Sequence, residues 1–247
     1  MPDPSPAMLA ARLEAGLRAV ATRDRAEHEK RYLKSDLQFL GVTVWQIRVA
    51  VREQLKEIGA VEHQTLVALV EHLWAAPIHE RRMAAVVLLE MRSKLLSVAD
   101  LALLERLIRE SKTWALVDGL AGEVVGAILG ADEEATVRTL DRWAADEDFW
   151  VRRSALLAWL RPLRDGAPLH RFLVYADAML DEREFFIRKA IGWVLREAGK
   201  RRPDEVADWV APRTHRASGV TIREATKYLS PAIRDQLMAA HRKKRPV

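Results

Sequence analysis

Cysteine is absent from the 247 residues of the sequence. Its absence excludes disulfide bonds, thiolate zinc sites, iron–sulfur clusters and a cysteine nucleophile. An uninterrupted apolar run of 18 residues is also absent, so we expect no membrane span and no membrane partner. The apolar stretch near the N-terminus contains Arg12, Glu14 and Arg18, which argues against a secretory signal. These absences together predict a cytoplasmic protein.

Sequence signatures of metal and cofactor sites are missing as well. The seven histidines do not form HExxH or another metal-ligand spacing. There is no P-loop, no GxGxxG that opens a helix, and no GxSxG around a serine nucleophile. We therefore expect neither a metal nor a cofactor.

What is present is a small excess of positive charge and an unusual set of aromatic residues. The 40 Lys and Arg against 35 Asp and Glu give a net charge of +5, which permits nucleic acid as a partner but does not require it. There are eight Trp against three Tyr and five Phe. Indoles bind flat or cationic groups well, so this bias fits a site for such a ligand. The alternative is that most of the tryptophans fill the core.

Helical periodicity runs through almost the whole chain, and we find no β-alternating segment of useful length. Glycine and proline are few and fall between the periodic blocks. Ser97, Asp132 and Ser230 stand at N-cap positions, and Pro231 follows the last of them at a first helical position. The pattern predicts an all-α protein with helices at about 7–22, 24–34, 43–58, 62–75, 79–95, 98–110, 114–129, 132–145, 149–163, 167–180, 183–199, 203–210, 219–229 and 231–244.

An internal repeat appears when these blocks are stacked. The anchoring arginines are spaced by 33, 71, 36 and 35 residues, and the interval of 71 is one skipped repeat. A helix pair that recurs about every 35 residues is typical of an α-solenoid. We expect residues 1–247 to form a single solenoid domain of about six HEAT-like helix pairs, with a concave basic face and a short basic tail at 241–247. A protein-binding scaffold of this kind is an alternative function. The anchors are Arg48, Arg81, Arg152, Arg188 and Arg223.

Trp193 interrupts the pattern of the helix at 183–199. At about 100° per residue it lies away from the apolar stripe of that helix. Its neighbours at helical spacing are Lys189, Arg196 and Lys200, so we expect the indole to stand in a basic stripe and to face a polyanion. The alternative is an indole packed against the next repeat under lysine side chains.

Arg153 interrupts the helix at 149–163, because it falls within the apolar stripe formed by Phe149, Leu156 and Leu160. A buried cation is costly unless it is paired, so an acidic or phosphate partner is expected. The sequence does not decide whether Arg153 forms a structural salt bridge within the protein or contacts a phosphate.

The skipped repeat carries the third interruption. Trp114 and Asp118 are four residues apart and therefore share one helix face. Small and apolar neighbours predict a partly buried carboxylate with an indole one turn away. The alternative is that Asp118 only pairs with Arg153 or another nearby base.

Three segments contain these residues: KTWALVD (112–118), DFWVRRSA (148–155) and EFFIRKAIGWVLRE (184–197). Together with YLKSDLQFLGV (32–42) and IREATKYL (222–229), they resemble the AlkD-type DNA alkylation-repair glycosylases over nearly the whole chain. The resemblance implies a HEAT-like solenoid whose concave face holds duplex DNA. One departure is local, since Trp114 is followed by Ala115 where family members often carry a second Trp.

The same resemblance implies a function and assigns residues to it. The expected reaction is hydrolysis of the N-glycosidic bond of N3- and N7-alkylated purines in duplex DNA, without base flipping into a pocket and without strand cleavage. A monomer is expected. A non-catalytic DNA-binding paralogue remains an alternative. The residues matched to catalysis are Asp118, Trp114 and Trp193, and those assigned to DNA binding are Arg153, Tyr32, Lys189, Arg188, Arg196 and Lys200.

Overall fold

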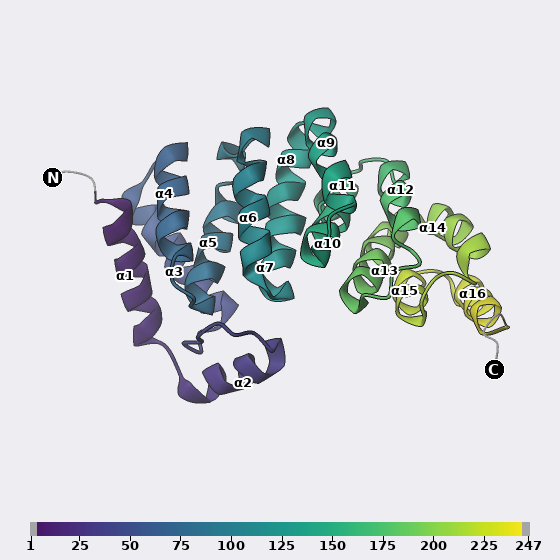
Figure 1. Cartoon of the computed structure of the whole chain (residues 1–247), viewed down its shortest axis with the longest axis horizontal. Helices are drawn as coiled ribbons and strands as arrows, with labels where there is room; N and C mark the ends of the chain where they lie inside the picture. The colour runs from purple at the N-terminus through teal and green to yellow at the C-terminus, as the bar shows by residue number, and fades with distance from the viewer. Residues whose placement is uncertain (1–3, 244–247) are drawn as a thin grey trace. The chain divides into compact units, whose positions relative to one another are not determined.

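The computed structural model describes residues 4–243, and its regular elements are helices (Figure 1). Within these residues no strand forms, and the only β-type pairing is an isolated parallel bridge between Gln38 and Ile78. The prediction of an all-α protein is therefore confirmed. The last residues of the basic tail, 244–247, lie outside the described part of the chain.

The chain divides into two compact units, Met1–Leu120 and Ala121–Val247. The expectation of one solenoid domain with a concave basic face stays a prediction. In the first unit, pairs of helices stack side by side, and α4 packs on both α1 and α5. Its helices are α1 (Pro6–Ala19), α2 (Arg23–Leu33), α3 (Val44–Ile58), α4 (His63–Trp74), α5 (His79–Met91), α6 (Leu101–Ser111) and α7 (Trp114–Gly119), with short 3₁₀ turns at Ser93–Leu95 and Val98–Asp100.

The second unit repeats the same kind of packing, with α13 against α10, α14 and α15. Asp132 and Ser230 accept hydrogen bonds from Ala135 N and Ile233 N as N-caps, and Pro231 is the first residue of its helix, as predicted. The helices are α8 (Gly126–Ala131), α9 (Glu133–Ala144), α10 (Phe149–Leu157), α11 (Leu160–Arg164), α12 (His170–Ala178), α13 (Phe185–Gly199), α14 (Pro203–Val210), α15 (Gly219–Ala225) and α16 (Pro231–Lys243), with a 3₁₀ turn at Ala211–Arg213.

Two predicted helices are less regular than expected. The helix expected at 149–163 is divided into α10 and α11, because Pro162 has no N–H to donate to the carbonyl of Ala158. The helix expected at 114–129 passes through a π-helical segment at Leu120–Val125 between α7 and α8. A π segment inserts an extra residue into a turn and is often found at functional sites.

The segment Trp114–Ala131 is also long and apolar enough to cross a membrane by length and composition, with a mean hydropathy of 1.5. The segment was not found as an uninterrupted apolar run in the sequence, because the acidic residues Asp118 and Glu123 interrupt it. Since 56% of the segment is buried inside the structure, we interpret it as a core helix of the repeat.

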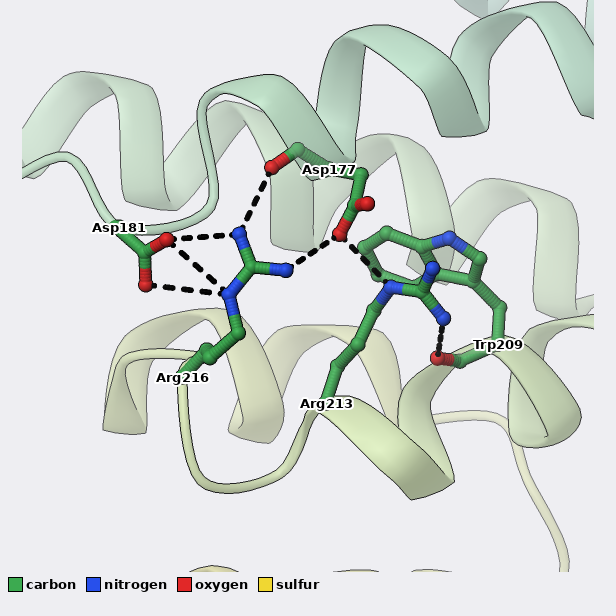
Figure 2. Close-up of polar contacts among 5 residues, drawn as sticks. All are labelled: Asp177, Asp181, Trp209, Arg213 and Arg216. Carbon is green, nitrogen blue, oxygen red and sulfur yellow. Dashed lines mark hydrogen bonds and ion pairs between the residues drawn. The ribbon is translucent and has the colours of Figure 1, made fainter.

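An ion-pair network ties α12 to the turn after α14 in the second unit (Figure 2). Arg213 lies over the ring of Trp209, 4.6 Å from its centroid, and donates from Nε to Asp177 Oδ1 at 2.9 Å. Arg216 donates to the same oxygen at 2.8 Å and to Asp181 Oδ2 at 2.7 Å. Two guanidinium groups therefore share one carboxylate, and the hydrogen bond from Arg213 lowers the pKa of Asp177 although burial opposes the shift.

We expect Asp177→Asn to destabilise the fold at neutral pH but not in acid. A carboxylate whose pKa is lowered by folding stabilises the protein above its unfolded pKa, and this contribution is lost as pH falls through the folded pKa. The Asp177 side chain is 39% exposed, so solvent screening limits the loss to about 1 kcal/mol or less. Urea midpoints of variant and parent should differ at pH 7 and converge as pH falls below about 3.9. A difference that persists unchanged in acid would contradict this explanation.

Candidate functional site

Helix α7 carries Trp114 as its first residue and Asp118 one turn later. The chain enters α7 through Lys112, whose φ of 49° is left-handed, and Thr113, which is extended. This sharp turn ends α6 and starts α7 at the indole. Both Trp114 and Asp118 are half-buried, and partial burial of Asp118 was predicted from its small and apolar neighbours. Gly119 then packs closely on α5, since an added Cβ would lie 2.7 Å from Val86 Cγ1, and this contact fixes the depth of α7.

Tyr32 lies against Trp114, although the two residues are far apart in the sequence. Their rings meet edge to face, with centroids 5.8 Å apart and an interplanar angle of 88°. His28, one turn earlier on α2, stacks on Tyr32 at 6.4 Å. Tyr32 is 65% exposed, so the tyrosine ring is presented to solvent beside the indole. The structure thus brings together two of the predicted site residues, and Asp118 follows one turn from them.

Helix α2, which carries Tyr32, has no buried residue of its own. Its position is set by the chain on either side of it. Gly41 accepts a hydrogen bond from Thr22 N, and its φ of 84° brings it so close that an added Cβ would lie 2.0 Å from Thr22 O. Only glycine fits this contact, because any side chain would collide with the backbone at the start of α2.

Glu80 holds the segment that returns from α2. This fully buried carboxylate accepts Leu40 N at 2.9 Å through Oε2, and Gly41 N at 2.7 Å and Val42 N at 3.2 Å through Oε1. Three backbone donors are therefore satisfied by one side chain at the start of α5. Because this anchored segment follows directly from α2 and contacts its start through Gly41, Glu80 is a positioning residue for the aromatic pair.

In the second unit, Trp193 lies on α13 and is half-buried. The cations at helical spacing from Trp193 are paired with carboxylates. Lys189 and Arg196 both form ion pairs with Glu224 of α15, and Lys200 pairs with Glu197 at 2.5 Å. Burial by itself would raise the pKa of Glu224, but the hydrogen bond from Lys189 and the charge of Arg196 outweigh burial and lower it. A helical projection of α13 does not include carboxylates from α15, so these ion pairs were not predicted, and the contact of Trp193 with a polyanion stays a prediction.

Close packing of α13 on α15 makes this pairing possible. At Gly192 an added Cβ would lie 2.6 Å from Glu224 Cβ and 3.0 Å from the carbonyl oxygen of Thr221. We expect Gly192→Ala to separate the two helices, loosen the pairs made by Glu224, and lower the free energy of unfolding by about 1–3 kcal/mol. The measurement is the urea midpoint.

The matched control for that substitution is Gly130→Ala on α8 in the same unit. Gly130 has no neighbour within 4 Å of an added Cβ, so the methyl group should leave stability unchanged or raise it by about 1 kcal/mol through helix propensity. Equal destabilisation by the two substitutions would show that close packing at Gly192 is not the cause.

The other predicted DNA contacts of the second unit are also engaged within the protein. Arg153 is only 2% exposed, donates from Nη1 to Phe186 O at 2.5 Å, and lies 5.7 Å from the centroid of the Phe186 ring. Arg188 donates from Nε to Glu182 O at 2.7 Å. A carbonyl and an aromatic ring thus act as partners of Arg153, and its phosphate contact stays a prediction.

The predicted residues fall into two groups. Tyr32, Trp114 and Asp118 belong to the first unit, whereas Arg153 and Trp193 belong to the second. Their meeting on one face stays a prediction. Among residues 4–243 no group of three or more His, Cys, Asp or Glu side chains could hold a metal ion.

Comparison with known proteins identifies the family of the chain. The family model described as DNA alkylation repair enzyme matches residues 13–229. The chain belongs to the DNA alkylation repair enzyme family. This family was predicted from the same segments that carry Trp114, Asp118 and Trp193.

Two solved structures are similar to this member of the DNA alkylation repair enzyme family. One is a predicted DNA alkylation repair enzyme from Enterococcus faecalis, with a TM-score of 0.77 and 22% identity over 85% of this chain and 97% of that chain. The other is the Pseudomonas fluorescens alkylpurine DNA glycosylase AlkC bound to DNA containing an abasic site analog, with a TM-score of 0.49 and 17% identity over 95% of this chain and 68% of that chain. No curated protein matches the sequence.

The eight tryptophans of this DNA alkylation repair family member differ in how far their side chains are exposed. Most of them fill the core, which confirms the alternative interpretation of the Trp bias, whereas Trp114 and Trp193 are half-buried. Trp45 on α3 is 72% exposed, and the sequence analysis did not single it out. The sequence did contain a signal for its exposure, because Trp45 is the second residue of an amphipathic helix and lies outside the apolar stripe of that helix. The buried tryptophans are Trp74, Trp143, Trp150, Trp159 and Trp209.

Proposed function

We propose that the protein is a monofunctional DNA glycosylase that hydrolyses the N-glycosidic bond of N3- and N7-alkylated purines in duplex DNA. Family membership over residues 13–229 supports the repair role. The observation that carries the catalytic assignment is the half-buried Asp118, one helical turn from an indole that contacts an exposed tyrosine.

The chemistry requires a fixed negative charge beside the sugar. Alkylation at N3 or N7 makes the purine cationic and therefore a good leaving group. The barrier is then mainly the positive charge that develops on the sugar as the bond breaks. In the proposed mechanism the Asp118 carboxylate stabilises that charge and accepts a proton from the attacking water. Partial burial strengthens the electrostatic effect because less water screens it.

The aromatic side chains fit the same transition state. The faces of Trp114 and Trp193 attract positive charge, so in the proposed complex they contact the sugar and backbone of the lesion. Tyr32 extends this surface with an exposed ring and a hydroxyl that can donate to a phosphate. Contact from the backbone side requires no pocket for the base, so bulky adducts are also substrates in this mechanism.

The cations of the second unit have a role that follows from their pairing. Lys189 and Arg196 already share Glu224, with side chains 38% and 21% exposed. A DNA phosphate can replace or supplement the carboxylate as their partner, and as the partner of Lys200. At Arg188 a phosphate would add to the carbonyl of Glu182. Binding through these groups is independent of sequence and weakens as salt rises. Arg153 is proposed to hold a phosphate of the same strand.

The test is the release of 7-methylguanine from methylated duplex DNA by the purified protein, followed by heating to reveal abasic sites. Free base together with an intact strand before heating is the expected result. DNA binding without base release would identify a non-catalytic paralogue, and the absence of both would identify a protein-binding scaffold.

A further inference from the structure

Helix α3 presents a second surface stripe, opposite its buried face. The buried side is formed by Ile47, Val51, Gln54 and Leu55. At about 100° per residue, Trp45, Arg52 and Lys56 fall within about 40° of one another on the other side. All three are exposed, and the indole is 72% exposed. We call Trp45, Arg52 and Lys56 the α3 stripe.

The basic end of the α3 stripe opens into a hollow of about 420 Å³ where α3 and α5 end. Arg52, Lys56 and Arg92 line it, together with the apolar side chains of Leu55 and Met91. Three cations therefore converge on one small volume in the first unit.

These three cations differ from most of the basic residues around them. Within residues 4–243, no carboxylate lies at ion-pair distance from Arg52, Lys56 or Arg92, and Arg92 makes only a long hydrogen bond of 3.4 Å to Met91 O. Elsewhere in the same unit arginines are usually neutralised. Those with a carboxylate partner are Arg12, Arg18, Arg23, Arg25, Arg48, Arg81, Arg106 and Arg109.

Converging like charges without a counter-charge are electrostatically unfavourable, so they favour binding of an anion. The guanidinium groups offer planar pairs of donors that match phosphate oxygens, and the ammonium group adds a point charge. The aliphatic floor of Leu55 and Met91 fits the apolar edge of a sugar. A phosphodiester satisfies both features, whereas a free phosphate would leave the apolar floor without a partner.

We propose that this hollow binds a backbone phosphate of duplex DNA, outside the residues assigned to catalysis. Trp45 lies seven residues from Arg52, which is about 10.5 Å along the helix, so the indole reaches the backbone about two phosphates farther along the same strand. The α3 stripe therefore acts as a non-specific clamp on the duplex. The choice of DNA as the ligand rests on the proposed function.

The experiment measures binding of the full chain to an undamaged duplex of 25 base pairs, by fluorescence anisotropy over a range of salt concentrations. The variant is Arg52→Ala/Lys56→Ala. Losing one phosphate contact should reduce the slope of log K against log salt by about 0.9 and weaken binding about 8-fold at 0.1 M salt. Trp45→Ala should weaken binding by a similar factor without changing the slope, because it removes contact area and no charge.

The charge-matched control is Arg138→Ala/Arg171→Ala, which removes two exposed cations from α9 and α12. Its affinity and salt slope should stay closest to those of the parent. Equal weakening by both double variants would show that only net charge matters and would overturn the proposal. Parental binding by Arg52→Ala/Lys56→Ala would also overturn it.

A separate arm distinguishes this proposal from the proposed function. If the parent releases 7-methylguanine while both double variants bind DNA alike, the enzyme assignment stands and the clamp is wrong. If the parent neither binds duplex DNA nor releases base, both are wrong. The clamp would also be wrong if the parent bound inorganic phosphate but not duplex DNA, and if both double variants bound phosphate as the parent does. Urea midpoints equal to that of the parent confirm that the variants are folded.

Discussion

Asp118→Asn is expected to reduce the release of 7-methylguanine by about 100-fold or more, while duplex binding stays near the parental value. The amide keeps the size and shape of the carboxylate but cannot offset the positive charge that develops on the sugar, nor accept the proton from water. Removal of one preorganised electrostatic group from an active site typically costs this much in rate. The measurement is single-turnover excision from methylated duplex at saturating protein, because saturation separates chemistry from binding.

The control for this prediction is Asp235→Asn on α16, an exposed carboxylate whose side chain is 72% exposed and pairs only with the adjacent Arg234 among the described residues. It removes the same charge far along the chain from the assigned site, so parental excision is expected. Parental excision by Asp118→Asn would remove Asp118 from the mechanism. Equal loss in both variants would point to a general effect of net charge.

The fold was largely predictable because each helix carries its own signal. Apolar residues at helical spacing located nearly all the helices, and Asp132 and Ser230 marked helix starts with side chains that accept backbone hydrogen bonds. The errors came from features that periodicity does not report. The π segment at Leu120–Val125 keeps the apolar pattern while changing the backbone, and Pro162 divides a helix that is amphipathic along its whole length.

The candidate site was predictable to the extent that it is local. Trp114 and Asp118 were found because four residues separate them, so one helix determines their relation. Trp114 and Tyr32 lie on α7 and α2, which are far apart in the sequence, and only resemblance to a family indicated Tyr32. Glu224 was missed for the same reason, since its partners Lys189 and Arg196 lie on another helix. Residues that act across elements leave no periodic trace in a single sequence.

Glu80 is the clearest example of a residue whose role depends on distant backbone. In the sequence it is one acidic residue in IHERRM, next to an anchoring arginine of the repeat. In the structure it is fully buried and accepts three backbone N–H groups from the segment after α2. Burial of those donors without an acceptor would be costly, so the carboxylate decides whether this segment stays on α5.

We therefore expect Glu80→Gln to lower the free energy of unfolding by about 2–4 kcal/mol. The amide has a single oxygen, so its NH₂ group must face Leu40 N, or Gly41 N and Val42 N, as donor against donor. Release of this segment should also free Tyr32 from Trp114 and reduce excision. The measurements are the urea midpoint and amide hydrogen exchange of residues 34–43, which should accelerate more than exchange in α4.

Glu27→Gln provides the matched control, since it makes the same chemical change on α2 at a side chain that is 52% exposed and pairs only along the helix with Arg23 among the described residues. Its stability should stay within about 0.5 kcal/mol of the parent, the range of exposed ion pairs. If Glu80→Gln matched this control in stability and in exchange, backbone hydrogen bonds to Glu80 would not hold the segment. The position of Tyr32 would then depend on the other contacts of α2, among them its ring contact with Trp114 and the hydrogen bond between Thr22 and Gly41.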